Sequence, residues 1–175
     1  SIMSVYGSLI YMSSIPGGWI ADRITGTRGA TLIGAILIII GHICLSLPFA
    51  MVGLFTSMFF IIVGSGLMKP NISNIVGRLY PENDVRMDAG FVIFYMSVNM
   101  GALVSPIILQ HYIDIRNFHG GFLIAAIGMA LGLVWYLLFN RKTLGSIGMK
   151  PTNPLSSSEK KKYGTIIGIV VIAIV

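Results

Sequence analysis

One lysine lies inside a long apolar run, and this combination limits the folds that the chain can adopt. Lys69 is the only ionisable residue between Leu54 and Gly77, a stretch long enough for an α-helix to cross about 30 Å of hydrocarbon. A charge at that depth costs from about 3 to more than 10 kcal/mol, so such residues usually face a protein interior or a watery cavity. The nearer end of the run is about 13 Å away, which is beyond the comfortable reach of a lysine that snorkels to a headgroup. We therefore expect Lys69 to line a transport path.

The composition also indicates a membrane protein. Hydrophobic residues make up 55% of the sequence and charged residues 10%, with a mean hydropathy of +0.85, which a water-soluble core does not explain. The net charge of +6 does not indicate nucleic-acid binding, because the basic residues lie in short connectors between apolar spans. The single cysteine, Cys44, excludes an intrachain disulfide and a multi-cysteine zinc or redox site. We expect an all-α membrane protein without cofactor or metal, and not an enzyme.

Five apolar spans within residues 1–140 are expected to form membrane helices of one bundle. They cover residues 1–21, 30–47, 54–77, 89–113 and 120–139. Residues 141–162, rich in proline, serine and lysine, are expected to form a cytoplasmic linker, and residues 163–175 to begin an additional transmembrane helix. Because the sequence begins and ends inside apolar runs, we expect it to be part of a longer membrane protein.

The distribution of basic residues predicts the orientation of these spans. The connectors after the first, third and fifth spans carry Arg23, Arg28, Arg78, Arg86, Arg141, Lys142, Lys150, Lys160, Lys161 and Lys162, whereas the two opposite connectors carry only Arg116. The positive-inside rule places the basic connectors, after residues 21, 77 and 139, in the cytoplasm of a multi-pass protein of the cell membrane. Small residues in the spans are expected to allow close helix packing, namely Gly34, Gly41, Gly64, Gly66 and the pair Gly128-x-x-x-Gly132.

Polar residues accompany Lys69 in the membrane spans. Pro70 removes a backbone donor, so the helix is expected to bend there and to leave the Gly66 carbonyl for protein or water to satisfy. Tyr11 ends a stripe of hydroxyls on the first span, and Asn99 falls near the middle of the fourth span. The Asn99 amide can donate and accept at once, which suits a ligand with amide groups. An interhelical hydrogen bond is the alternative for both residues. Their chemistry alone leaves the choice open for Asn99 and slightly favours the structural role for Tyr11.

The partner of Lys69 is predicted to come from outside this sequence. All six acidic residues fall in connectors or in the linker: Asp22, Glu82, Asp84, Asp88, Asp114 and Glu159. A carboxylate next to a lysine in a low dielectric would favour its charged form. The partner is therefore expected to be a carboxylate of a missing helix or of the substrate itself.

Three motifs together resemble the proton-dependent oligopeptide transporters of the major facilitator superfamily. The sequence GGWIADR at residues 17–23, followed by Gly26 and Arg28, is similar to the loop motif of these peptide transporters. The sequence FVIFYMSVNMGAL at residues 91–103 resembles their second signature, and GSGLMKPN at residues 64–71 resembles their fourth transmembrane helix. The resemblance covers essentially the whole sequence and implies helices two to six of a twelve-helix core, a partial N-terminal six-helix bundle.

The resemblance also implies roles for individual residues. Lys69 matches the lysine expected to bind the peptide carboxyl end and to take part in proton coupling, Asn99 the asparagine that binds the peptide backbone, and Tyr11 the binding-site tyrosine. Asp22, Arg23 and Arg28 match the loop motif that latches helices in one state of the transport cycle. Arg78 is a candidate donor to Asp22 in this latch. Ser4 stands where animal members carry a histidine, which favours a bacterial type of transporter.

The expected function is proton-coupled symport of di- and tripeptides across the cytoplasmic membrane by alternating access. Its expected partners are the peptide, protons, the lipid bilayer, and the first helix and C-terminal bundle of the same protein, which are outside this sequence. Two alternatives remain open: transport of nitrate or another small anion within the same family, and a membrane scaffold that transports nothing and whose polar stripes only hold helices together.

Overall fold

A computed structural model of the chain describes residues 2–48, 50–115, 117–156 and 159, and the described residues form helices without strands. The helices in chain order are α1 (Ile2–Met12), α2 (Ser14–Ile20), the π-helix η1 (Ala21–Thr25), α3 (Gly26–Ser46), α4 (Ala50–Gly77), α5 (Arg86–Asp114) and α6 (Phe118–Leu144). Four helical stretches in this part of the chain are long and apolar enough to cross a membrane. The expectation of an all-α membrane bundle is confirmed, whereas the expected additional helix at residues 163–175 lies outside the described residues.

The first helical stretch, Ser4–Ser46, is 43 residues long and supplies two antiparallel spans. After the first span the chain stays helical through η1 and reverses direction at Gly26. Gly26 has a φ of 73°, in the left-handed region that favours glycine, and its N–H donates to the Ala21 carbonyl. The glycine that ends the charged turn is therefore required by the backbone conformation.

The seam between α2 and α4 depends on two glycines. A Cβ on Gly17 would overlap the backbone carbonyl of Gly66, and a Cβ on Gly66 would overlap Ser13. Ser13 donates from its hydroxyl to the Ile62 carbonyl (2.9 Å). Contacts therefore advance along α2 and α4 in the same direction, so these two helices are parallel. The Gly66 carbonyl, which Pro70 removes from the helical hydrogen-bond ladder, lies against the Gly17 backbone.

The seam between α3 and α4 runs in the opposite sense. Gly34 lies against Gly64, and Gly41, one heptad later on α3, lies against Ser57 and Ile61 on α4. Contacts that advance on α3 while retreating on α4 define an antiparallel pair, as the short connector requires. Small residues at these crossings let the two backbones approach closely, as they do in other membrane bundles.

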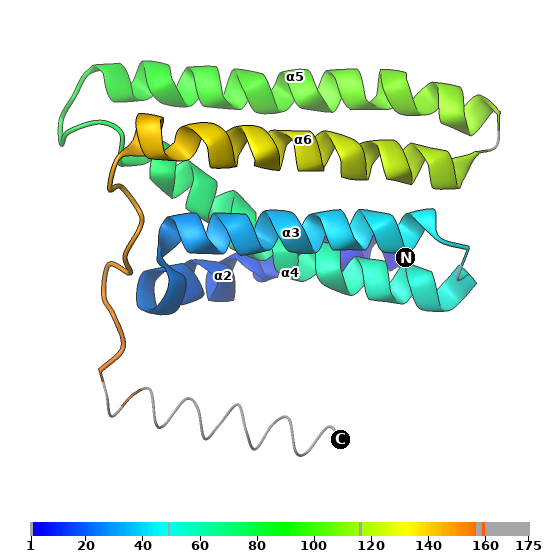
Figure 1. The fold of residues 1–175 in the computed structure, drawn as a ribbon, viewed down its shortest axis with the longest axis horizontal. Helices are drawn as coiled ribbons and strands as arrows, with labels where there is room; N and C mark the ends of the chain where they lie inside the picture. Colours follow the sequence, from blue (N-terminus) through cyan, green and yellow to red (C-terminus); the bar gives the residue numbers. More distant parts are fainter. Residues whose placement is uncertain (1, 49, 116, 157–158, 160–175) are drawn as a thin grey trace.

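The last two helices form an antiparallel pair, α5 with α6, and α6 lies beside α3 (Figure 1). The prediction that Gly128 and Gly132 supply a close helix contact is wrong within the described residues, because a Cβ on either would meet no atom within 4 Å. α6 also continues to Leu144, past the expected end of its span at residue 139. The most apolar part of α5 contains no buried residue, as expected for a helix whose partners are lipid or helices outside this chain.

Candidate functional site

Lys69 and Tyr11 meet on one side of the bundle. The Lys69 ammonium lies over the Tyr11 ring, 5.9 Å from the ring centroid. Tyr11 comes from the end of α1 and Lys69 from the second half of α4, so two spans far apart in the sequence contribute to this contact. A cation over an aromatic face is attracted by about 0.5–1 kcal/mol when exposed and more when desolvated. Both side chains are exposed, and Tyr11 is 77% exposed, so the pair presents its charge outward from this chain.

A buried asparagine fixes the helix turn that carries Lys69. Asn71 is 2% exposed, and its amide donates to the carbonyls of Leu67 (2.7 Å) and Gly17 (3.3 Å). Asn71 thus satisfies a carbonyl on α2 and one on its own helix, which fits a structural role for a buried amide. Because Asn71 points into the α2–α4 seam, Lys69 two residues earlier points away from it.

An apolar hollow of about 520 Å³ lies on the same α1–α4 side of the bundle. Its lining comes from Val5, Tyr6, Leu9, Phe55, Met58, Phe59 and Ile62. Phe55, Ile62 and Lys69 follow one another at seven-residue intervals and therefore share one face of α4. This face thus combines an apolar surface with one ammonium group.

The third predicted site residue is not joined to the other two. Asn99 lies on α5, is exposed, and donates from its amide to the Tyr95 carbonyl one turn earlier (2.9 Å). In the part of the chain that the structure describes, no contact links Asn99 to Lys69 or Tyr11. The bond to its own helix leaves the Asn99 carbonyl oxygen and one amide hydrogen available.

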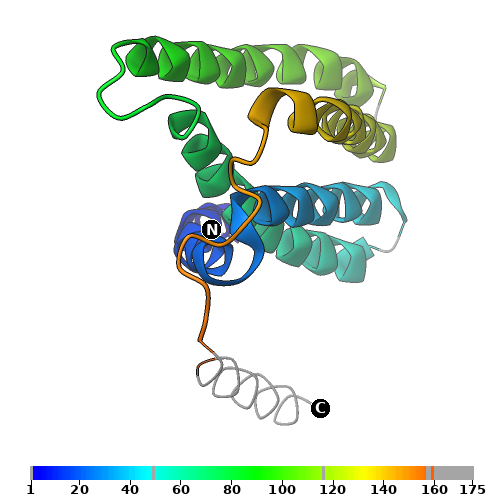
Figure 2. The same cartoon turned by 60° about the vertical axis from the view of Figure 1, so that its left-hand side comes forward.

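The predicted latch residues gather at the end of the bundle where α2 ends and α3 begins. Residues 145–156, here called the strap, cross this end after α6 (Figure 2). Arg28 donates to the Gly145 carbonyl (2.9 Å), Arg23 to the Asn153 carbonyl (3.3 Å), and Arg78 to the Thr152 hydroxyl (2.6 Å). Three cations from three helical elements thus hold one segment.

The backbone of the strap adds hydrogen bonds of its own. The N–H of Arg28 donates to the Gly148 carbonyl (3.1 Å), and the N–H groups of Asn153 and Leu155 donate to the carbonyls of Asp22 (2.9 Å) and Arg23 (3.3 Å). The candidate bond from Arg78 to Asp22 is replaced by the bond to Thr152. These strap contacts have no signal in the sequence, because most of them use main-chain atoms that any residue could supply.

Two partly buried carboxylates outside the membrane spans have lowered pKa values. The Arg86 side chain, and then its backbone N–H, hold the pKa of Asp84 at about 2 at the start of α5. The backbone N–H and the hydroxyl of Ser156, helped by Arg23 at 3.4 Å, lower the pKa of Glu159. The described residues contain no cluster of three or more His, Cys, Asp or Glu that could hold a metal ion.

Curated proteins with similar sequences are membrane transporters. A di-/tripeptide transporter of Lactococcus lactis subsp. lactis (strain IL1403) is 44% identical over 98% of this chain and 35% of its own length. The uncharacterized transporter YclF of Bacillus subtilis (strain 168) is 48% identical over 99% of this chain and 35% of its own length. The chain thus spans about a third of the length of these relatives.

Solved structures agree with these relatives. A crystal structure of a POT family transporter in complex with 5-aminolevulinic acid has a TM-score of 0.95 and 86% identity, covering 99% of this chain and 36% of that chain. A crystal structure of the peptide transporter POT (E310Q mutant) in complex with alafosfalin has a TM-score of 0.93 and 50% identity, over 99% of this chain and 36% of that chain. The sequence profile of the POT family matches residues 29–170. The chain therefore belongs to the POT family of transporters.

Proposed function

We propose that the full-length protein containing this chain takes up di- and tripeptides together with protons by alternating access. The observation that carries this proposal is the ammonium of Lys69 held over Tyr11 on an exposed face of α4. A peptide offers a carboxylate in every case, whereas its side chains vary. A fixed cation beside an apolar hollow can bind the peptide carboxylate and tolerate different peptide side chains. The relatives named as di-/tripeptide transporters support the same substrate class.

Each site residue has a proposed role in this cycle. Lys69 binds the peptide carboxylate and takes part in proton coupling. Tyr11 orients the ammonium through its ring, and Asn99 uses its free amide groups to bind the peptide backbone. The site lies near the bilayer midplane and is completed by helices outside this chain.

The conformational latch is proposed to consist of Asp22, Arg23, Arg28 and Arg78 together with the strap. The bonds of the three arginines to residues 145–153 support it, because they join the ends of η1, α3 and α4 into one unit. Asp22 takes part through its backbone carbonyl. A unit of this kind can move as a rigid body and form or break contacts with the other half of a transporter. By the positive-inside rule, this end faces the cytoplasm.

Uptake into proteoliposomes tests the proposal. The full-length protein is reconstituted, and accumulation of a labelled dipeptide is measured with and without an inward proton gradient. We expect gradient-dependent accumulation that an unlabelled dipeptide competes away. Accumulation no greater than in protein-free liposomes, or nitrate uptake that dipeptides do not inhibit, would refute peptide symport.

A further inference from the structure

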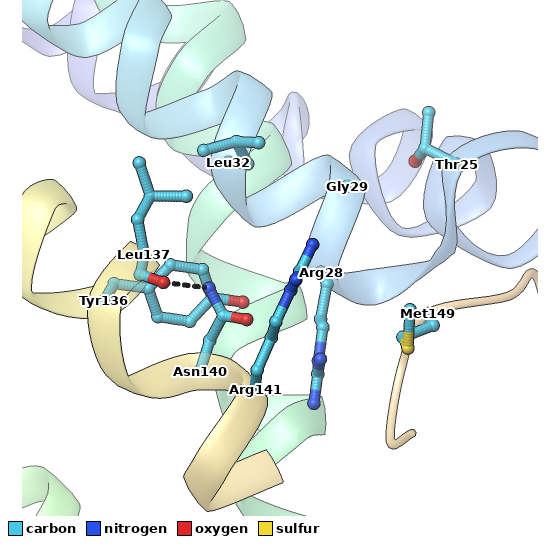
Figure 3. A pocket seen from close by; sticks show the side chains of 9 residues that line it. All are labelled: Thr25, Arg28, Gly29, Leu32, Tyr136, Leu137, Asn140, Arg141 and Met149. Atoms are coloured by element: carbon cyan, nitrogen blue, oxygen red, sulfur yellow. Dashed lines mark hydrogen bonds between the residues drawn. The ribbon is translucent and has the colours of Figure 1, made fainter. Parts of the chain in front are cut away.

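A second pocket lies between the start of α3 and the end of α6, and its lining residues (Figure 3) do not include Lys69. It has a volume of about 240 Å³. Its lining residues are Thr25, Arg28, Gly29, Leu32, Tyr136, Leu137, Asn140, Arg141 and Met149, and none of these nine is acidic. The pocket therefore gathers two guanidinium groups without a carboxylate among the side chains that form it.

Arg28 brings an incompletely satisfied charge into this pocket. It is 9% exposed, and its Nε has no hydrogen-bond partner among the described residues, although its terminal nitrogen donates to the Gly145 carbonyl (2.9 Å). Neither Arg28 nor Arg141 forms an ion pair within the described part of the chain. Burying a cation without a counter-charge is unfavourable, so an anion in the pocket would remove a cost that the chain alone leaves uncompensated.

One neutral donor in the same pocket is available to an oxyanion. The Tyr136 hydroxyl is buried and has no partner among the described residues. Figure 3 shows this hydroxyl on the side of the two arginines, whereas the Asn140 amide donates to the Leu137 carbonyl (3.2 Å). A phosphate group accepts several hydrogen bonds at once, and arginine binds it through two parallel N–H groups. The two arginines and the Tyr136 hydroxyl among the lining residues supply donors of that kind.

The position of the pocket places it where membrane phosphates lie. Arg28 is in the first turn of α3 and Arg141 in the last turn of α6, at the end of the bundle that carries most of the basic residues. Leu32, Leu137 and Met149 give the pocket an apolar side next to its cations. We propose that this pocket binds a phosphate group, either that of an anionic phospholipid of the cytoplasmic leaflet or free phosphate.

The binding test uses the purified, delipidated full-length protein in detergent micelles. Thermal stabilisation is titrated with phosphatidylglycerol, with diacylglycerol of the same acyl chains, and with inorganic phosphate alone. Arg141→Gln removes one cation of the pocket. Lys142→Gln removes the neighbouring cation, which does not line the pocket, and is the matched control. The readout is binding and not transport, so its result is independent of the proposed peptide symport.

A lipid site predicts that phosphatidylglycerol stabilises the protein, that diacylglycerol does not, and that Arg141→Gln weakens binding about tenfold while Lys142→Gln does not. If inorganic phosphate gives the same stabilisation with the same dependence on Arg141, and the lipid adds nothing, free phosphate is the ligand and the site is supported. Equal effects of the two substitutions, or no stabilisation by either phosphate compound, would overturn the proposal.

Tyr136→Phe keeps the test decisive if Arg141→Gln fails to fold. Without a ligand, the Tyr136 hydroxyl has no partner among the described residues, so its removal should leave the apo protein equally stable or more stable. With a bound phosphate, the same change removes a donor and should weaken binding about fivefold. An unchanged phosphate affinity in Tyr136→Phe, with Arg141→Gln unfolded, would contradict the proposal.

Discussion

Cations occupy two regions of this molecule, and their contacts differ between the two. At membrane depth, Lys69 is exposed on the face of α4, and the contact that the structure gives its ammonium is the face of the Tyr11 ring. At the end of the bundle, Arg23, Arg28 and Arg78 donate to carbonyls and a hydroxyl of the strap. The chain thus ties each of these three arginines to the strap through a hydrogen bond, whereas the contact of Lys69 is with an aromatic ring.

This difference suggests a ligand-binding role for Lys69 and a structural role for the arginine nitrogens that hold the strap. A nitrogen that already donates to the strap gains little from a ligand, whereas an ammonium beside an aromatic ring can still gain a full charge-assisted hydrogen bond. Changes at Lys69 should therefore affect transport more than stability, and changes at the strap should do the reverse. The following predictions test that division, from the largest expected effect to the smallest.

Lys69→Ala in the full-length protein should lower proton-driven dipeptide uptake by about 10- to 100-fold, because it removes a charge-assisted hydrogen bond to the peptide carboxylate. Initial uptake rates in proteoliposomes measure the effect. Lys142→Ala, a cation at the end of α6, is the control and should retain uptake near that of the unchanged protein. Equal rates for Lys69→Ala and the unchanged protein would remove Lys69 from the binding site.

Gly17→Ala should destabilise the protein by about 1–3 kcal/mol, because the added methyl group meets the rigid backbone of Gly66 and forces α2 and α4 apart. Gly18→Ala is a matched control on the same helix, since its Cβ would meet nothing within 4 Å. It should be neutral or stabilise by up to about 1 kcal/mol. Thermal melting of both variants measures the difference, and equal melting temperatures would show that the seam tolerates separation.

Thr152→Val should loosen the strap with a cost near 1 kcal/mol, because it removes the hydroxyl that accepts from Arg78 at 2.6 Å on the surface. The expected readout is faster hydrogen exchange at the backbone amides of Asn153 and Leu155, with dipeptide affinity unchanged. A large loss of dipeptide affinity without faster exchange would contradict the assignment of the strap to fastening.

Acid should weaken the strap through Glu159. The pKa of this carboxyl is lowered in the folded chain, so its contribution is present above the ordinary value of 4.5 and is lost as the pH falls through the lowered pKa. Amide protection at Asn153 and Leu155, normalised at each pH to the unfolded chain, should fall below about pH 4.5. Glu159→Gln should flatten this response, and an identical profile in the variant would exclude the carboxylate as its cause.

The helical fold could be predicted from the sequence, and Lys69 could be singled out as a candidate site residue. Uninterrupted apolar length determines which segments can cross a bilayer, and the charged connectors determine where they end. A lone charge in such a span needs a partner inside the protein. The apolar residues on both sides of Lys69 in the sequence were therefore enough to identify it as a candidate. The structure places the Tyr11 ring beside the Lys69 ammonium, a contact that the spacing of the sequence does not predict.

The strap could not be predicted, because all of its bonds to the three arginines and Asp22 except Arg78–Thr152 join residues more than a hundred positions apart through main-chain carbonyls or N–H groups. No pattern of side chains encodes which carbonyl an arginine will reach. The predicted close contact at Gly128 and Gly132 is missing from the described residues for a related reason. Small residues permit two helices to approach closely, but they do not specify which helix is the partner. Asn99 stays a prediction, because the chain gives its amide a partner only on its own helix.

The central claim is that Lys69 binds the carboxylate of a peptide, and a comparison of two ligands on two proteins tests it most directly. The affinities of a dipeptide and of its C-terminally amidated analogue are measured by thermal stabilisation of the full-length protein and of its Lys69→Ala variant. We expect the unchanged protein to prefer the free carboxylate by about tenfold or more and the variant to lose that preference. The same preference in both proteins would contradict the claim.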